Sequence, residues 1–173
     1  MTPEEQQFRA ELVSLLPRLR RFGRAIARHR EDADDLVQAA VERALLRRGQ
    51  LQPGTKMLSW MFKIMNNAWI DEVRSRSRRE QIFAPEESGA HVGVSPMDDH
   101  LNALAVRGAI EQLNEEQRIA VGLVLVEGLP YKEAADVLGV PIGTVTSRIA
   151  RAREQLQALL SEHVGARRMH AAQ

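Results

Sequence analysis

Cysteine is absent from the 173-residue sequence, and aromatic residues make up only 4% of it. The lack of cysteine excludes disulfides, thiolate zinc sites and cysteine nucleophiles. No apolar run approaches the roughly 20 residues that a membrane-spanning helix needs. The first residues, MTPEEQQF, lack the basic and apolar regions of a signal peptide. We therefore expect a cytoplasmic protein.

What is present indicates a helical, globular protein with one ordinary domain or two small ones. Hydrophobic residues make up 44% of the chain and charged residues 27%, as in soluble globular proteins. Strand-forming residues occur singly rather than in alternating runs, whereas Ala, Leu, Arg, Glu and Gln are abundant. This composition predicts an all-α fold.

The net charge of +1 is a balance of segregated blocks. Basic residues gather at 18–30, 74–79 and 148–153, and acidic residues gather at 31–35, 86–87 and 98–99. Local patches, rather than totals, decide whether a protein face binds phosphate. The basic blocks are therefore candidate nucleic-acid contacts.

Three helices are expected in the first 80 residues. Apolar residues recur at helical spacing over 8–26, and Pro17 inside this run predicts a kink or a split. A second helix is expected from about Glu31–Asp32, where acidic residues suit the positive end of the helix dipole. A third, over about 57–79, carries both tryptophans and ends in RSRSRR. Together they predict a helical bundle over residues 1–80.

Helical periodicity stops over residues 81–100, where Pro, Gly, Ser and paired acidic residues predict a linker. A second helical domain is expected over 101–162. Within it, Asn114 can cap a helix and Gln117 stands at the capping-box position. The basic segment 163–173 is expected to be a disordered tail after a helix that ends near residue 160.

Residues 131–153, YKEAADVLGVPIGTVTSRIARAR, have the pattern of two short helices joined by a tight turn. Gly139 stands where the first helix must end, a place that favours the left-handed conformation that glycine adopts cheaply. The second helix starts at about Ile142 and is rich in arginine. This is the helix-turn-helix pattern, in which the second helix enters the DNA major groove.

Three motifs, in order along the chain, resemble those of a known family. They are DADDLVQAAVERAL at 32–45, SWMFKIMNNAWIDEVRSRSRR at 59–79 and LPYKEAADVLGVPIGTVTSRIARAREQL at 129–156. The chain resembles a bacterial extracytoplasmic-function sigma factor of the sigma-70 family, over roughly residues 12–160. The resemblance implies two small helical domains, sigma-two and sigma-four, joined by a flexible linker. It also implies a protein that binds core RNA polymerase and directs it to a promoter.

The resemblance further implies three contact surfaces. The second helix would dock on the largest polymerase subunit through Asp34, Asp35, Gln38 and Glu42. The third helix would contact the promoter's minus-ten element through Trp60, Lys63, Asn66, Asn67, Arg74, Arg76, Arg78 and Arg79. The helix-turn-helix would read the minus-thirty-five element through Tyr131, Lys132, Glu133, Thr144, Thr146, Ser147, Arg148, Arg151 and Arg153.

The side-chain types suit these tasks, although other interpretations remain open. Aromatic rings can stack on unpaired bases, amides can bond exposed base edges, and arginines can follow phosphates or bind guanine. The acidic face can instead be solvated surface, the arginine run a solubilising helix end, and Arg153 an intrahelical partner. Trp60 and Trp69 can be packed inside the bundle. Thr146 replaces the lysine or arginine usual in the family, so a different DNA preference is expected.

Two other functions compete with that of a sigma factor. A dimeric helix-turn-helix regulator would explain residues 131–153 equally well but would leave the third helix and the acidic face unused. An enzyme is not supported, because the five histidines show no metal-ligand spacing and no glycine-rich phosphate loop follows a strand. No catalysis, metal or cofactor is therefore expected. The implied partners are core RNA polymerase, promoter DNA and an anti-sigma factor.

Overall fold

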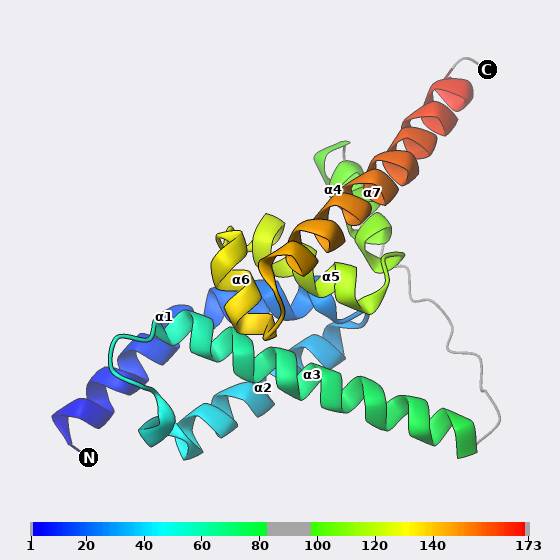
Figure 1. Cartoon of the computed structure of the whole chain (residues 1–173). Coiled ribbons are helices and arrows are strands. Elements are labelled where there is room, and N and C mark those ends of the chain that lie inside the picture. Colours follow the sequence, from blue (N-terminus) through cyan, green and yellow to red (C-terminus); the bar gives the residue numbers. More distant parts are fainter. Residues whose placement is uncertain (1, 83–97, 172–173) are drawn as a thin grey trace.

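The computed structural model describes residues 2–82 and 98–171. Every regular element in these ranges is helical, which confirms the all-α fold (Figure 1). The elements are α1 (Pro3–Ile26), α2 (Arg30–Leu46), the short 3-10 helix η1 (Arg48–Gln50), α3 (Met57–Ile82), α4 (Asp98–Glu111), α5 (Glu115–Val121), the π-helical segment η2 (Gly122–Val126), α6 (Tyr131–Leu138) and α7 (Ile142–Ala171). The predicted linker at 81–100 lies largely outside the described residues.

Helix α1 runs continuously through Pro17, so the split predicted as one outcome there does not occur. Thr2 caps the helix, since its hydroxyl accepts a hydrogen bond from the N–H of Glu5 at 3.2 Å. Pro17 has no N–H to bond the carbonyl of Val13. Val13 is 63% exposed, so water can bond that carbonyl instead. The proline therefore removes one hydrogen bond on the solvent side without ending the helix.

Helices α1, α2 and α3 form the N-terminal bundle, in which α2 lies against both α1 and α3. Phe22 of α1 and Phe62 of α3 meet at its centre with ring centroids 4.8 Å apart. Both rings are completely buried, as are Leu19 and Met61. Each such side chain contributes about 1.5–3 kcal/mol through burial, so this apolar centre fixes how the three helices pack.

Helices α4 to α7 form the C-terminal domain, whose turns follow the predicted chemistry. Asn114 caps α5, with its Oδ1 accepting a hydrogen bond from the N–H of Gln117 at 2.9 Å. Gly139 ends α6 with φ of +66°, the left-handed conformation expected of it. Val145 and Ile149 on α7 are buried, which leaves the opposite side of this helix open. Helices α6 and α7 therefore form the predicted helix-turn-helix.

Helix α7 is longer than the sequence indicates. The prediction placed its end near residue 160 and a disordered tail over 163–173, but the helix continues to Ala171. Residues 161–171 contain no proline and include the helix formers Glu, Ala, Arg and Met. Because each residue added to an existing helix gains a backbone hydrogen bond, the helix can propagate through them. Figure 1 shows this last part projecting away from the other helices.

The N-terminal bundle and the C-terminal domain pack against each other. Helix α1 lies against α4, α5 and η2, and α3 lies against α6 (Figure 1). Buried side chains from both parts form one hydrophobic cluster, which includes Phe22 and Ile26 with Ile119 and Leu123. The sequence predicts two domains and a linker but does not predict this packing.

Candidate nucleic-acid and polymerase interfaces

The polar face of α2 is open to solvent. Asp34, Asp35, Gln38 and Glu42 are all exposed. Gln38 donates a hydrogen bond to Glu42 at 3.1 Å, and Asp34 lies 3.9 Å from Arg30. Surface pairs of this kind contribute at most about 1 kcal/mol. They therefore leave the face available to a polar or basic partner.

Four of the candidate minus-ten contacts on α3, namely Trp60, Lys63, Asn66 and Asn67, are in different environments. Lys63 and Asn67 are exposed, whereas Trp60 is half-buried and packs edge-on against Phe8, with ring centroids 6.3 Å apart. Asn66 is only 2% exposed, and its Oδ1 has no hydrogen-bond partner among the described residues. Asn67 is thus accessible to a partner, whereas the side chain of its neighbour Asn66 is buried.

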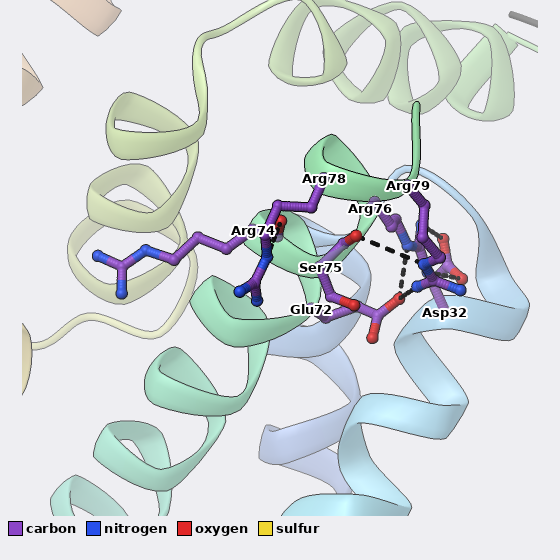
Figure 2. A network of polar contacts seen from close by, with 7 residues as sticks. All are labelled: Asp32, Glu72, Arg74, Ser75, Arg76, Arg78 and Arg79. Carbon is purple, nitrogen blue, oxygen red and sulfur yellow. Dashed lines mark hydrogen bonds and ion pairs between the residues drawn. The ribbon is translucent and has the colours of Figure 1, made fainter. Parts of the chain in front are cut away.

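Arg76 ties α3 to α2 (Figure 2). Its guanidinium donates to both carboxylate oxygens of Asp32, at 2.6 and 2.8 Å, and to Glu72 at 2.7 Å. It also lies 5.9 Å from the ring centroid of the buried Trp69. The hydrogen bonds from Arg76 hold the pKa of the Asp32 carboxyl below its ordinary value. The Arg76 guanidinium is therefore occupied by contacts within the bundle and is poorly placed to bind phosphate.

The other three arginines near the end of α3 are exposed. Arg79 reaches Glu72 at 3.4 Å, a weak surface pair. Arg74 and Arg78 extend to the side away from Asp32, as Figure 2 shows. Arg78 donates to the backbone carbonyl of Arg74, one turn earlier on the helix, at 3.3 Å. Among these residues, Arg74 and Arg78 are the best placed to follow a phosphate backbone.

On α7, Val145, Ile149 and Ala152 are buried, Ser147 and Arg151 lie on the opposite side, and the other candidate contacts lie at its flanks. Thr146, Ser147, Arg151 and Arg153 are exposed, and Thr144 is half-buried. The hydroxyls of Thr146 and Ser147 donate to carbonyls of their own helix at 3.0 Å. Arg148 pairs with Glu116 at 2.9 Å. Arg151 is consequently the more accessible of the two central arginines.

At the start of α6, Glu133 makes contacts that the sequence did not indicate. It accepts hydrogen bonds from the hydroxyl of Ser59 and from Nζ of Lys56 at 3.1 Å, both near the start of α3. These bonds, that of Ser59 foremost, lower the pKa of the Glu133 carboxyl. Of its neighbours, Tyr131 is half-buried and Lys132 is exposed. Glu133 thus connects the start of α6 to the start of α3.

Two charged residues that sequence reasoning missed are buried at the boundary between the domains. Arg118 is 2% exposed and donates to the carbonyl of Ile26 at 2.7 Å, and its burial lowers its pKa. The side chain of Glu127 is completely buried between Arg18 and Arg21. In the sequence, these two residues are marked only by their position, one at each end of the apolar run 119–126. That signal does not identify a partner.

Within the described ranges, no helix is both long enough and apolar enough to cross a membrane. Over the same residues, no three His, Cys, Asp or Glu side chains are grouped so that they could hold a metal ion.

Comparison with known proteins agrees with this arrangement. Residues 103–156 match the family model described as Sigma-70, region 4, and residues 12–66 match the Sigma2 domain of PhyR. The ECF RNA polymerase sigma factor EcfG of Rhodopseudomonas palustris is 35% identical over 91% of this chain and 87% of that protein. The chain belongs to the extracytoplasmic-function sigma factor family.

Two further similarities support this membership. The ECF RNA polymerase sigma factor SigM of Mycobacterium tuberculosis is 38% identical over 82% of this chain and 71% of that protein. The solved structure of the sigma factor RpoE with the anti-sigma factor NepR, from Bartonella quintana, matches with a TM-score of 0.78 and 31% identity. That match covers 90% of this chain and 98% of that chain.

Family membership confirms the function that the three motifs predicted. The protein is a sigma factor, which binds core RNA polymerase and directs promoter-specific initiation of transcription. The match to both sigma domains favours this function over that of a stand-alone helix-turn-helix regulator.

Proposed function

We propose that three surfaces of this sigma factor divide its work. The polar face of α2, formed by Asp34, Asp35, Gln38 and Glu42, binds core RNA polymerase. Its support is that all four side chains are exposed on one helix whose other side is buried in the bundle. A row of acidic and amide groups suits a basic or polar partner helix.

Helix α3 contacts the minus-ten element once the strands separate. Asn67 and Lys63 are exposed for base and phosphate contacts, and Arg74 and Arg78 can follow the backbone. Trp60 has one face against Phe8, so it can contribute only its remaining surface to stacking. Asn66 is buried, and Arg76 is bonded to Asp32 and Glu72. We therefore assign Arg76 to holding α3 against α2.

Helix α7 reads the minus-thirty-five element as duplex. The single observation that carries this assignment is the exposed row of Thr146, Ser147 and Arg151 opposite a buried apolar face. Arginine can bind guanine through two hydrogen bonds, worth about 1–3 kcal/mol of discrimination. Arg148 and Arg153 flank this row, and Lys132 can contact the neighbouring phosphates.

The chain supplies recognition, and the chemistry belongs to the polymerase. We place the protein in the cytoplasm, where its polymerase and chromosome are expected to be. An anti-sigma factor is proposed as a further partner. The support is that the similar RpoE structure from Bartonella quintana is a complex with the anti-sigma factor NepR.

The test of this function is run-off transcription from a genomic promoter library with core polymerase, with and without the protein. We expect transcripts that depend on the protein and share an asymmetric two-block motif. Asp35→Arg should weaken core binding, whereas Glu11→Arg, an exposed change on α1, should not. Footprinting of a palindrome without polymerase would instead support a dimeric regulator.

A further inference from the structure

The first turns of α7 carry two neighbouring rows of exposed residues. Residues four apart lie one above the other on a helix face, so each set of three forms a row. The polar row consists of Gly143, Ser147 and Arg151. The methyl row consists of Ile142, Thr146 and Ala150. The methyl row contains no charged side chain, although it lies beside the arginine that we assign to guanine.

Thr146 belongs to the methyl row because of how its hydroxyl is bonded. The hydroxyl donates to the carbonyl oxygen of Ile142, one turn earlier on the same helix, at 3.0 Å. A threonine hydroxyl has one proton to donate, and this bond uses it. Thr146 is nevertheless exposed. Its methyl group therefore remains for apolar contact with a partner.

Ile142 is the first residue of α7, and its side chain is 51% exposed. In helix-turn-helix proteins, the N-terminal residues of the recognition helix contact base edges. The space beside this turn is open. Apart from its chain neighbours and its own helix backbone, no described atom lies within 4 Å of a Cβ placed on Gly143. Base edges can therefore approach Ile142 and Thr146 closely.

Thymine is the base that suits such a row. In the major groove it presents a C5-methyl group beside its O4 acceptor, whereas the other three bases present only hydrogen-bond donors and acceptors. An apolar side chain that contacts this methyl group favours thymine over cytosine. The polar row offers different chemistry, since Arg151 can bind guanine through two hydrogen bonds.

We propose that the methyl row, through Ile142 and Thr146, recognises the methyl groups of thymines in the minus-thirty-five element, beside a guanine read by Arg151. The proposal rests on the assignment of α7 to that element under the proposed function. It gives a chemical content to the different DNA preference that Thr146 leads us to expect.

Helix geometry limits where these bases can lie. Ile142 and Thr146 are four residues apart, which is about 6 Å along the helix axis. Successive base pairs are about 3.4 Å apart, so the two thymines should lie within about two base pairs of each other. Arg151 is about 7.5 Å beyond Thr146 along the axis. The guanine should therefore lie within about three base pairs of a contacted thymine.

The test removes one methyl group at a time from the DNA. A promoter selected by run-off transcription is rebuilt with deoxyuridine in place of each thymine of the minus-thirty-five element in turn. Deoxyuridine pairs as thymidine does and lacks only the C5-methyl group. Promoter affinity of the wild-type holoenzyme, measured by fluorescence anisotropy of labelled DNA, should fall about fourfold at each contacted thymine.

Two variants assign the contacts to residues. Thr146→Ser keeps the hydroxyl and removes the methyl, so it should bind the unmodified promoter about fourfold more weakly and lose the response to deoxyuridine at one position. Ile142→Ala should lose the response at a different position. The control Val13→Ala shortens another apolar side chain, 63% exposed on α1, and should keep both responses. Deoxyuridine in the minus-ten element should affect all these proteins equally.

Three results would overturn the proposal. They are a minus-thirty-five element without thymine, a wild-type affinity that no deoxyuridine changes, and responses that persist in full in either Thr146→Ser or Ile142→Ala. Each of them leaves the proposed function standing, because transcription still depends on the protein. The absence of any transcript that depends on the protein would overturn the proposed function, and this inference with it.

Discussion

Arg118 of α5 donates a hydrogen bond from Nε to the carbonyl oxygen of Ile26, at 2.7 Å, across the boundary between the two domains. The same guanidinium donates to the carbonyl of Leu113 at 3.2 Å and to the carboxylate of Glu115. Ile26 ends α1 and Leu113 follows α4, positions where carbonyls lack a helical partner. A cation suits this place because the negative ends of two helix dipoles lie nearby.

Arg118→Met should destabilise the protein, because it keeps an apolar stem but leaves these buried carbonyls without a donor. We expect the free energy of unfolding to fall by about 2–4 kcal/mol in urea titrations followed by circular dichroism. The control is Arg107→Met, which removes an exposed arginine that pairs with Glu111 at 3.2 Å. That change should cost less than about 1 kcal/mol. Equal losses in the two variants would contradict the role of Arg118.

The Asp32–Arg76 pair should make stability depend on pH in acid. The folded protein lowers the pKa of Asp32, so the folded state binds this proton less readily than the unfolded chain does. The contribution is present above the ordinary aspartate pKa, about 3.9, and is lost as pH falls through the lower folded value. Wild type should exceed Asp32→Asn in free energy of unfolding by about 1–2 kcal/mol at neutral pH. A difference that persists undiminished at about pH 2 would exclude this ion pair as the cause.

Arg151→Ala should weaken recognition of the minus-thirty-five element without changing the affinity of the factor for core polymerase. Arg151 is exposed on the side of α7 that we propose to face DNA, so its removal should lower promoter affinity of the holoenzyme about tenfold. Core affinity, measured by fluorescence anisotropy of the labelled factor, should stay unchanged. Arg20→Ala on α1 removes another exposed arginine and serves as the charge control. A similar loss of promoter affinity for Arg20→Ala would show a nonspecific charge effect.

The neighbouring asparagines of α3 should behave differently. Asn67 is exposed, so Asn67→Ala should leave the free energy of unfolding within about 0.5 kcal/mol and reduce strand opening at the promoter. Permanganate reactivity of melted thymines measures that opening. Asn66→Ala removes a buried Oδ1 that has no described partner, so it should destabilise the free protein by no more than about 1 kcal/mol. Unchanged thymine reactivity for Asn67→Ala would rule out the role assigned to that residue.

The sequence alone identified what depends on neighbours in the chain. Helical periodicity located the helices, and Asn114 and Gly139 marked a start and an end that the structure reproduces. These signals are local, because capping and turn conformation involve residues a few positions apart. The three motifs also identified the family, which the comparisons confirm.

The tertiary structure decided which of the candidate residues are accessible. Asn66 and Asn67 are adjacent and chemically identical, but Asn66 lies on the buried side of α3 and Asn67 on the exposed side. In the sequence, Arg76 is one of four similar arginines near the end of α3. In the structure, it differs from the others because Asp32, 44 residues away, accepts two hydrogen bonds from it. Glu133 likewise meets Ser59 only because α6 lies on α3. Such contacts join residues far apart in sequence, so neither periodicity nor spacing predicts them. The packing of the two domains against each other is likewise seen only in the tertiary structure.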